Sequence, residues 1–259
     1  MVKLLWYSFL FIFLTALTQI GGIVLLISLL IFSVRSLKTI TKVLMFIGLY
    51  FVTTFIIIPP LAQLCGREKI KNGKPTNYMS VILNRNYVKP ELNVILSELE
   101  SLASYENANI HYLDANFPFL DGFPLLPHLS HNDGKKLDIS LVYESPSGKL
   151  SDKQKSVSGY GVFEGPKDGE PDQIATCKKA GYFQYDYPKY LTFGEINKDL
   201  QFSEKGTKLL IEVLLKFDNM EKIFIEPHLK SRLGLTNSKI RYHGCGAVRH
   251  DDHIHIQVK

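Results

Sequence analysis

Two short segments of the chain concentrate histidines and aspartates. The first runs from His128 to Asp138 and the second from His250 to His255, and together they hold five of the eight histidines and four aspartates. Neutral imidazoles and carboxylates are ligands of zinc, and an imidazole is also a general base near neutral pH. The two segments therefore predict a zinc centre whose ligands come from distant parts of the sequence.

The second segment enters a predicted strand over residues 253–258. Side chains two residues apart on a strand point to the same face, so His253 and His255 can face one site. Ile254 and Ile256 then face the opposite side, toward a core. His250 lies three residues earlier, on the turn into the strand, where it can overhang the same site.

In the first segment, Gly134 breaks the chain between His131 and Asp138 and lets the loop fold back, so that both residues can bind one ion. Asp138 begins a predicted strand, which is a rigid place for a ligand. Two histidines and an aspartate leave the fourth tetrahedral position of zinc open, which is typical of a catalytic site. Water in such a position is a usable nucleophile near neutral pH.

The remaining histidines lack this context. These are His111, His228 and His243, and of them His228 and His243 are expected to be structural. A His-x-His pair on its own would commonly be a surface feature. Cys245 has two interpretations: it joins His243 as an alternative ligand pair, or it forms a disulfide with Cys177 in an oxidising compartment. Three basic residues are candidates to bind substrate carboxylates or are simply solvated: Lys136, Arg241 and Arg249.

An α+β fold must position these residues, with a small antiparallel sheet flanked by helices. Strands are predicted over 110–113, 137–143, 222–226 and 253–258, and helices over 89–104, 203–218 and 227–234. Pro90 suits a first helical turn, and the apolar residues Leu92, Ile95, Leu99 and Leu102 recur at helical spacing. Ser203 is a predicted helix cap. Residues 144–189 are predicted to be irregular, and such a long insertion is usually functional, for example as a wall of a substrate cleft.

The first 66 residues are strongly apolar. Residues 4–34 and 43–66 contain no Asp, Glu, Lys or Arg, and each run exceeds the roughly 20 residues needed to cross a bilayer. We expect two transmembrane helices in residues 1–66, a linker over 67–85 and a domain that holds the zinc centre over 86–259. A cleaved signal peptide is the alternative for the first run.

The net charge of +5 comes mainly from this amino-terminal part. Residues 1–66 carry four basic and no acidic side chains, so the rest of the chain is near neutral and gives no case for nucleic-acid binding. Arg35, Lys38 and Lys42 predict a cytoplasmic loop between the spans and both termini on the other side. The basic residues over 67–74 argue for the opposite orientation.

These residues carry a resemblance to known zinc peptidases. The pattern His131-x-x-Gly134-x-x-x-Asp138 followed by His253-x-His255 resembles the signature shared by lysostaphin, D-Ala-D-Ala peptidases and the hedgehog signalling domain. The penicillin-insensitive murein endopeptidase family is the closer match, since it adds a histidine at the positions of His128 and His250. The segment 222–227 before a short helix is also similar. The resemblance covers about residues 110–259.

The resemblance implies one zinc ion per chain, with His131, Asp138 and His255 as ligands. His250 matches the position of the general base. His253 would orient the water or polarise the substrate carbonyl, and His128 would line the site.

The function that this resemblance implies is a membrane-anchored zinc metallopeptidase that hydrolyses peptide cross-links of peptidoglycan. It would lie in a bacterial inner membrane, with its catalytic domain facing the periplasm or extracytoplasmic space. Two alternatives are a D-Ala-D-Ala carboxypeptidase or dipeptidase with the same zinc site, and a non-catalytic zinc-binding domain that binds the cell wall or a partner.

Overall fold

The computed structural model describes residues 2–34, 36–105 and 110–259, without the side chains of residues 102–109. The chain forms two compact units. Unit 1 consists of Met1–Ile70, Tyr78–Pro90 and Asp114–Lys135, and unit 2 of Lys71–Asn77, Glu91–Leu113 and Lys136–Lys259. Each unit is described by itself.

The first apolar run is two helices, not one transmembrane span. Helix α1 (Val2–Thr18) and helix α2 (Gly21–Ser33) are separated by a break at Gln19, whose φ is +66°. The buried Gln19 side chain accepts a hydrogen bond from the backbone N–H of Phe119 at 2.9 Å, which explains why the chain turns there. Helices of 17 and 13 residues reach about 26 and 20 Å, which is less than the ~30 Å hydrocarbon core of a bilayer.

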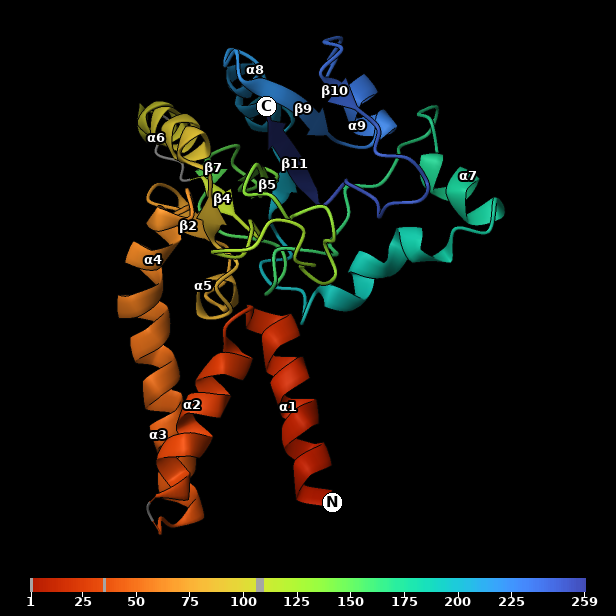
Figure 1. The fold of residues 1–259 in the computed structure, drawn as a ribbon. Helices are drawn as coiled ribbons and strands as arrows, with labels where there is room; N and C mark the ends of the chain where they lie inside the picture. Colours follow the sequence, from red (N-terminus) through yellow and green to blue (C-terminus); the bar gives the residue numbers. More distant parts are fainter. Residues whose placement is uncertain (1, 35, 106–109) are drawn as a thin grey trace. The chain divides into compact units, whose positions relative to one another are not determined.

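The two helices form a hairpin (Figure 1). A β-carbon on Gly22 would lie 2.0 Å from Oγ1 of Thr15, so glycine permits this close approach.

The second apolar run is a continuous helix over Thr39–Leu64, built from α3 (Thr39–Val52), the π-helical turn η1 (Thr53–Ile57) and α4 (Ile58–Leu64). Among the described residues it is the one helix long and apolar enough to cross a membrane, so the prediction of two such helices is wrong.

The π-helical turn has a local cause. Pro59 and Pro60 stand in the first turn of α4 and have no N–H to donate to the preceding turn. A wider turn accommodates this missing pair of hydrogen bonds.

Of the loop residues used to predict the membrane orientation, Arg35 lies outside the described residues.

The remainder of unit 1 packs on these helices. Tyr87 of strand β3 (Tyr87–Val88) shares a buried apolar cluster with Ile20, Val24, Ile58 and Ala62. In the stretch predicted as a linker, the structure contains β1 (Glu68–Lys69), which pairs with β3, as well as β2 (Lys74–Pro75) and α5 (Met79–Ile82). The buried Arg67 guanidinium donates to the carbonyl of Phe117 and to the carboxylate of Asp121.

Unit 2 contains a six-stranded sheet in the order β10, β9, β11, β5, β4, β2. Its strands are β10 (Ile240–Arg241), β9 (Met220–Phe224), β11 (His253–Val258), β5 (Lys136–Ser140), β4 (His111–Tyr112) and β2. The central pairs are antiparallel, but β10 with β9 and β2 with β4 are parallel. The same unit contains a separate three-stranded sheet, whose strands in spatial order are β7 (Leu150–Ser151), β6 (Tyr143–Glu144) and β8 (Gln201–Phe202). The α+β class is confirmed, but the sheets are more numerous and more mixed than the single small antiparallel sheet predicted.

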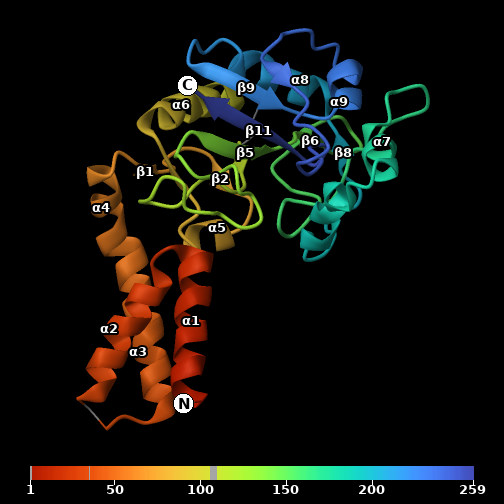
Figure 2. The ribbon, with the colours of Figure 1, turned by 45° about the vertical axis from the view of Figure 1, so that its right-hand side comes forward.

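The predicted helices of unit 2 are present as α6 (Pro90–Tyr105), α8 (Glu204–Leu214) and α9 (Pro227–Arg232). Ser203 caps α8 by accepting the Gly206 N–H at 3.3 Å, as expected. Leu92, Ile95 and Leu99 of α6 are buried, whereas the side chain of Leu102 lies outside those described. Helices α8 and α9 lie beside β9 (Figure 2).

The stretch 144–189 is more ordered than predicted. It contains β7, helix α7 (Gln173–Lys179) and most of the 3-10 helix η2 (Phe183–Leu191). Asp172 caps α7 by accepting the Ala175 N–H at 2.8 Å. The short α7 and the three-residue period of η2 fall outside the 3.6-residue pattern from which helices are usually predicted.

Candidate metal centre

The strand register brings Asp138 of β5 opposite His255 of β11. Oδ1 of Asp138 lies 2.9 Å from Nδ1 of His255 and 3.7 Å from Nε2 of His253. On the opposite face, Ile254 and Ile256 are completely buried. The predicted alternation of histidines and isoleucines along β11 is therefore confirmed.

These spacings suit ligands of one ion. Two ligand atoms at zinc distances and a tetrahedral angle lie roughly 3.3 Å apart. A second observation comes from the first segment, where His128, His131 and Asp138 each offer one ligand atom and these atoms lie within 4.8 Å of one another. The His128, His131 and Asp138 group could therefore hold a metal ion, and it includes a histidine that the sequence did not predict as a ligand.

The partners of His131 and Asp138 orient them for such a role. Nδ1 of His131 lies 2.7 Å from the carbonyl oxygen of Ala115, and because a carbonyl only accepts, the ring proton is on Nδ1. The lone pair is then on Nε2, as in a metal-ligating imidazole. In unit 2 the Tyr160 hydroxyl donates to Oδ2 of Asp138 at 2.8 Å, which orients the carboxylate.

His128 lies against a buried carboxylate. Its Nδ1 is 3.4 Å from Oδ2 of Asp114, and the Arg85 guanidinium lies 3.2 Å from the same oxygen. Burial favours the neutral acid, but His128 and Arg85 outweigh it and lower the pKa of Asp114. The ionised Asp114 thus orients the His128 ring.

His253 has two carboxylates beside it. Its Nδ1 lies 2.6 Å from Oδ1 of Asp252, while Nε2 faces Asp138. Burial opposes a charge on this ring, yet Asp138 and Asp252 raise the pKa of His253 to about 9. At neutral pH this imidazole is a proton donor, which suits the predicted role of polarising a carbonyl.

His250 has the opposite electrostatics. Its buried ring lies 4.8 Å from the His253 ring and 5.1 Å from the His243 ring, measured between centroids. Burial, together with the neighbouring imidazoles, holds the pKa of His250 well below its usual value. A neutral His250 is able to accept a proton, as a general base must.

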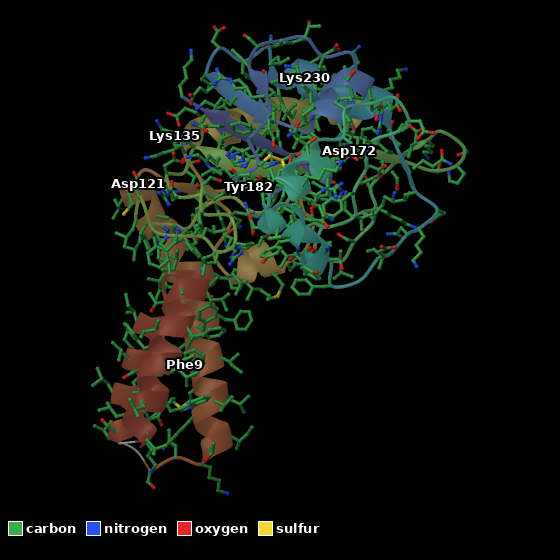
Figure 3. All side chains as sticks on the ribbon, turned by 90° about the vertical axis from the view of Figure 1, so that its right-hand side faces the viewer. Phe9, Asp121, Lys135, Asp172, Tyr182 and Lys230 are labelled. Carbon is green, nitrogen blue, oxygen red and sulfur yellow. A yellow bond between two sulfur atoms is a disulfide. The ribbon has the colours of Figure 1, made fainter. Side chains whose placement is uncertain are left out.

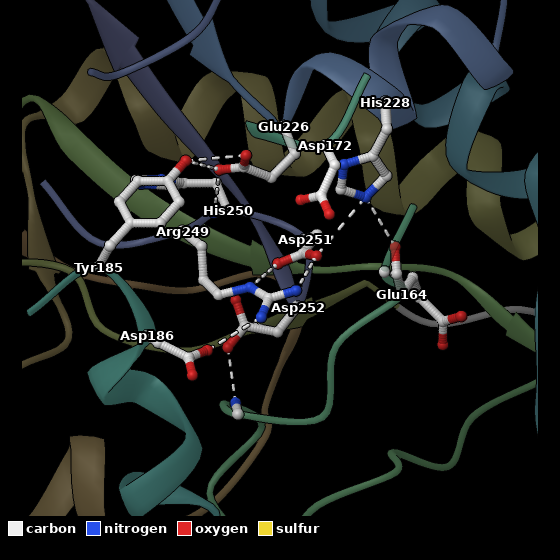
Figure 4. Close-up of polar contacts among 12 residues, drawn as sticks. Glu164, Asp172, Tyr185, Asp186, Glu226, His228, Arg249, His250, Asp251 and Asp252 are labelled. Atoms are coloured by element: carbon white, nitrogen blue, oxygen red, sulfur yellow. Dashed lines mark hydrogen bonds and ion pairs between the residues drawn. The ribbon is translucent and has the colours of Figure 1, made fainter. Parts of the chain in front are cut away.

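Glu226 lies two residues after the end of β9 and holds the backbone of His250 in place (Figure 4). The His250 N–H donates to Oε1 of Glu226 at 2.9 Å, and the Glu226 N–H donates to the His250 carbonyl at 3.1 Å. The Tyr185 hydroxyl lies 2.7 and 2.8 Å from the two carboxylate oxygens of Glu226. Burial raises the pKa of Glu226 to about 7.

Arg249, a candidate for binding substrate, is instead buried in an ion-pair network (Figure 4). Its guanidinium donates to both oxygens of Asp251 and, at 2.9 Å, to Oδ1 of Asp186. His228 lies 3.5 Å from Asp251 and 2.8 Å from the carbonyl oxygen of Glu164, in agreement with a structural role. The network holds the segment that precedes β11.

Cys245 is not a metal ligand, because it forms a disulfide with Cys177 of α7. The alternative ligand pair of His243 and Cys245 is therefore wrong. His243 nevertheless lies in the imidazole cluster, with its ring 4.3 Å from the Phe224 ring and 5.8 Å from the His255 ring.

Several residues of the site were not found from the sequence. Asp252 could have been predicted as a partner of His253, because the two residues are adjacent in the sequence. Tyr160 and Glu226 gave no such signal, since their proximity depends on chain segments that are far apart in sequence. His243 was named only as a possible ligand together with Cys245, and not as a neighbour of His250 and His255.

Comparison of the whole chain with models of known protein families and with curated proteins found no match to either.

Proposed function

We propose that this protein is a membrane-anchored zinc metallopeptidase that hydrolyses peptide cross-links of peptidoglycan. The observation that carries the proposal is the cross-strand pair of Asp138 and His255, with the His250 ring 5.9 Å from the His255 ring. We assign His131, Asp138 and His255 as the ligands. A mixed set of imidazole nitrogens and a carboxylate oxygen is typical of catalytic zinc.

Bound zinc would supply a Lewis acid for the scissile carbonyl and make water nucleophilic near neutral pH. The neutral His250 imidazole accepts the proton that water loses and passes it to the leaving amine. The protonated His253, oriented through Nδ1 by Asp252, donates toward the substrate oxygen. His128 lines the site beside them. The 2.6 Å contact of His253 with Asp252 and the position of the His250 ring, 4.8 Å from the His253 ring, support this division of roles.

Two observations support the proposed location. The helix Thr39–Leu64 is long enough to span a membrane. The disulfide of Cys177 with Cys245 suits an oxidising compartment outside the cytoplasm. The choice of peptidoglycan peptides as the substrate rests on the resemblance in residues 110–259.

The full-length protein, purified without added metal, should contain about one zinc per chain. It should convert cross-linked muropeptide dimers in purified peptidoglycan to monomers, and a chelator should abolish this activity. His250→Ala should retain zinc and lose activity by about 10²–10⁴-fold, the usual contribution of a general base. His255→Ala should lose both zinc and activity.

Other outcomes discriminate the alternatives. Loss of terminal D-Ala without loss of dimers would identify a carboxypeptidase. Full activity in His250→Ala would exclude the proposed base, and well-folded protein that contains no metal would exclude the zinc peptidase altogether.

A further inference from the structure

The surface of unit 2 carries one concentrated group of aromatic side chains. Among its described residues, nine large hydrophobic side chains are exposed, and all five that are aromatic fall within residues 182–193. They are between 42% and 76% exposed and are here named the aromatic platform: Tyr182, Phe183, Tyr187, Tyr190 and Phe193. Figure 3 faces this part of the unit and labels Tyr182.

The helical period explains why these rings point outward. A 3-10 helix has three residues per turn, so residues three apart share a side. Tyr185 and Pro188 form the buried side of η2. Tyr187 and Tyr190 share the exposed side, with ring centroids 6.2 Å apart. The platform is therefore a second apolar side of the helix and not part of the core.

Phe193 extends the platform beyond the helix. Its φ is +51°, which is unfavourable for a bulky residue, and the residue is 76% exposed. A backbone conformation of this kind persists only when the surroundings impose it. Here this backbone conformation leaves the Phe193 side chain exposed, although contact of an apolar ring with water is unfavourable.

Three lysines lie in the same segments as the platform, and two of them, Lys178 and Lys189, pair with Asp186. Lys178 and Lys179 end α7, and Lys189 follows Pro188 within η2. The Nζ of Lys189 lies 5.0 Å from the centre of the Tyr190 ring and 2.8 Å from Oδ2 of Asp186. Aromatic rings flanked by lysines are typical of surfaces that lie in the interface between lipid and water, where the rings enter the headgroup region and the ammonium groups stay with phosphates.

We propose that the aromatic platform inserts into the headgroup region of the membrane that holds the Thr39–Leu64 helix, with its lysines facing anionic lipids. The proposal rests on the membrane attachment proposed above and is independent of the metal. Its occupant is a lipid surface because the same chain carries an apolar helix of spanning length, so unit 2 is tethered beside a bilayer. The platform would then restrict the orientations of the catalytic unit on the membrane.

Single-tryptophan variants of the full-length protein test this proposal. Trp6 is the one tryptophan of the chain, so Trp6→Phe provides the background. Three reporters are added singly: Tyr190→Trp on the platform, Phe51→Trp in the proposed span, and Leu209→Trp as a control exposed on α8. Each protein is reconstituted into vesicles of phosphatidylcholine and phosphatidylglycerol, with and without bromine atoms on the phosphatidylcholine acyl chains, placed near the headgroup for positions 183, 190 and 209 and near the chain ends for position 51, which lies in the middle of the span.

We expect brominated lipid to quench the tryptophans at 51 and 190 and to leave the one at 209 unchanged. Phe183→Trp is a second platform reporter, in case the change at Tyr190 disturbs folding. Quenching at 51 with no quenching at 183 or 190 would overturn the platform proposal and leave the membrane attachment standing. No quenching at any position would overturn both.

A cell-wall surface is the rival interpretation. If Tyr187→Ser with Tyr190→Ser weakened sedimentation of the protein with purified peptidoglycan, while position 190 escaped quenching, the platform would be a glycan-binding surface and the lipid proposal would be wrong.

Discussion

Asp138 and His255 face each other across two antiparallel strands, with Oδ1 of one 2.9 Å from Nδ1 of the other. Their meeting depends on the register between β5 and β11, because a slip of one residue would turn either side chain to the opposite face. The register is held by the apolar residues behind it, where Ile254 pairs with Ile139 and Ile256 with Leu137. The core on one face of the sheet thus determines the chemistry on the other.

Tyr160→Phe should weaken metal binding without unfolding the protein. The change removes the hydrogen bond from the Tyr160 hydroxyl to Oδ2 of Asp138 and keeps the ring. Loss of such a partner costs about 10–100-fold in metal affinity. The measurement is competition for zinc with a chromophoric chelator. Tyr187→Phe, at an exposed position, is the matched control, and equal affinities in the two variants would contradict the assigned role of Tyr160.

Glu226→Gln should remove a pH dependence of stability. Because the pKa of Glu226 is about 7 in the folded protein against an ordinary 4.5, the folded state binds the proton more tightly. Its stabilising contribution is complete below pH 4.5 and is lost as the pH rises to 7, by up to about 3 kcal/mol. Glutamine cannot lose a proton, so the variant should be the more stable protein at pH 7.5.

Thermal unfolding at pH 5 and pH 7.5 measures this difference. Groups that titrate away from residue 226 contribute equally to both proteins, so the comparison isolates residue 226 and the groups that contact it. Glu212→Gln, on the exposed side of α8, is the control. A gap between wild type and Glu226→Gln that does not grow with pH would show that the carboxyl is already ionised in the folded protein.

Reduction of the disulfide should lower stability substantially. The bond joins cysteines 68 residues apart, and a loop of this length corresponds to about 4 kcal/mol in the chain-entropy model. Dithiothreitol should therefore lower the melting temperature of the wild type and of Cys65→Ser, because Cys65 is not in the disulfide. The double variant Cys177→Ser with Cys245→Ser should melt early and show no response to reductant. A wild type that is insensitive to reduction would refute this expectation.

Gly134→Ala should be more harmful than Gly122→Ala. Both glycines have a left-handed φ, +81° and +79°, which costs an alanine about 1–2 kcal/mol. At Gly134 a β-carbon would also lie 3.1 Å from Cγ of Lys89 and 3.2 Å from Nε of Arg67, whereas it meets nothing at Gly122. Denaturant unfolding of both variants separates the backbone cost from the packing cost, and equal losses would show that the turn has room.

The parts of the fold that the sequence predicted correctly are those with a local period. Strand β11 follows from alternating histidines and isoleucines, and α6, α8 and α9 from their apolar spacing and from Ser203 and Pro227 at their starts. The turn at Gly134 was also predicted, because left-handed backbone favours glycine.

The features that were missed depend on distant contacts. Nothing near Glu226 in the sequence indicates that Tyr185 and His250 meet it. The break at Gln19 lies in a run of residues that is apolar throughout, and its cause is a hydrogen bond from Phe119, one hundred residues away. The disulfide was left open because the spacing of cysteines does not reveal distance.

The break at Gln19 also changes how many times the apolar chain runs along the helical bundle of unit 1, and therefore at which end each segment begins. One continuous first helix would bring the amino terminus and the Lys38 loop to opposite ends of the helical bundle. Because α1 and α2 are antiparallel instead, Lys3 comes to the same end as Lys38 and Lys42, and the Thr39–Leu64 helix then runs to the other end (Figures 1 and 2). One turn thus brings Lys3, Lys38 and Lys42 to a single end, so that the positive-inside rule no longer separates the amino terminus from that loop.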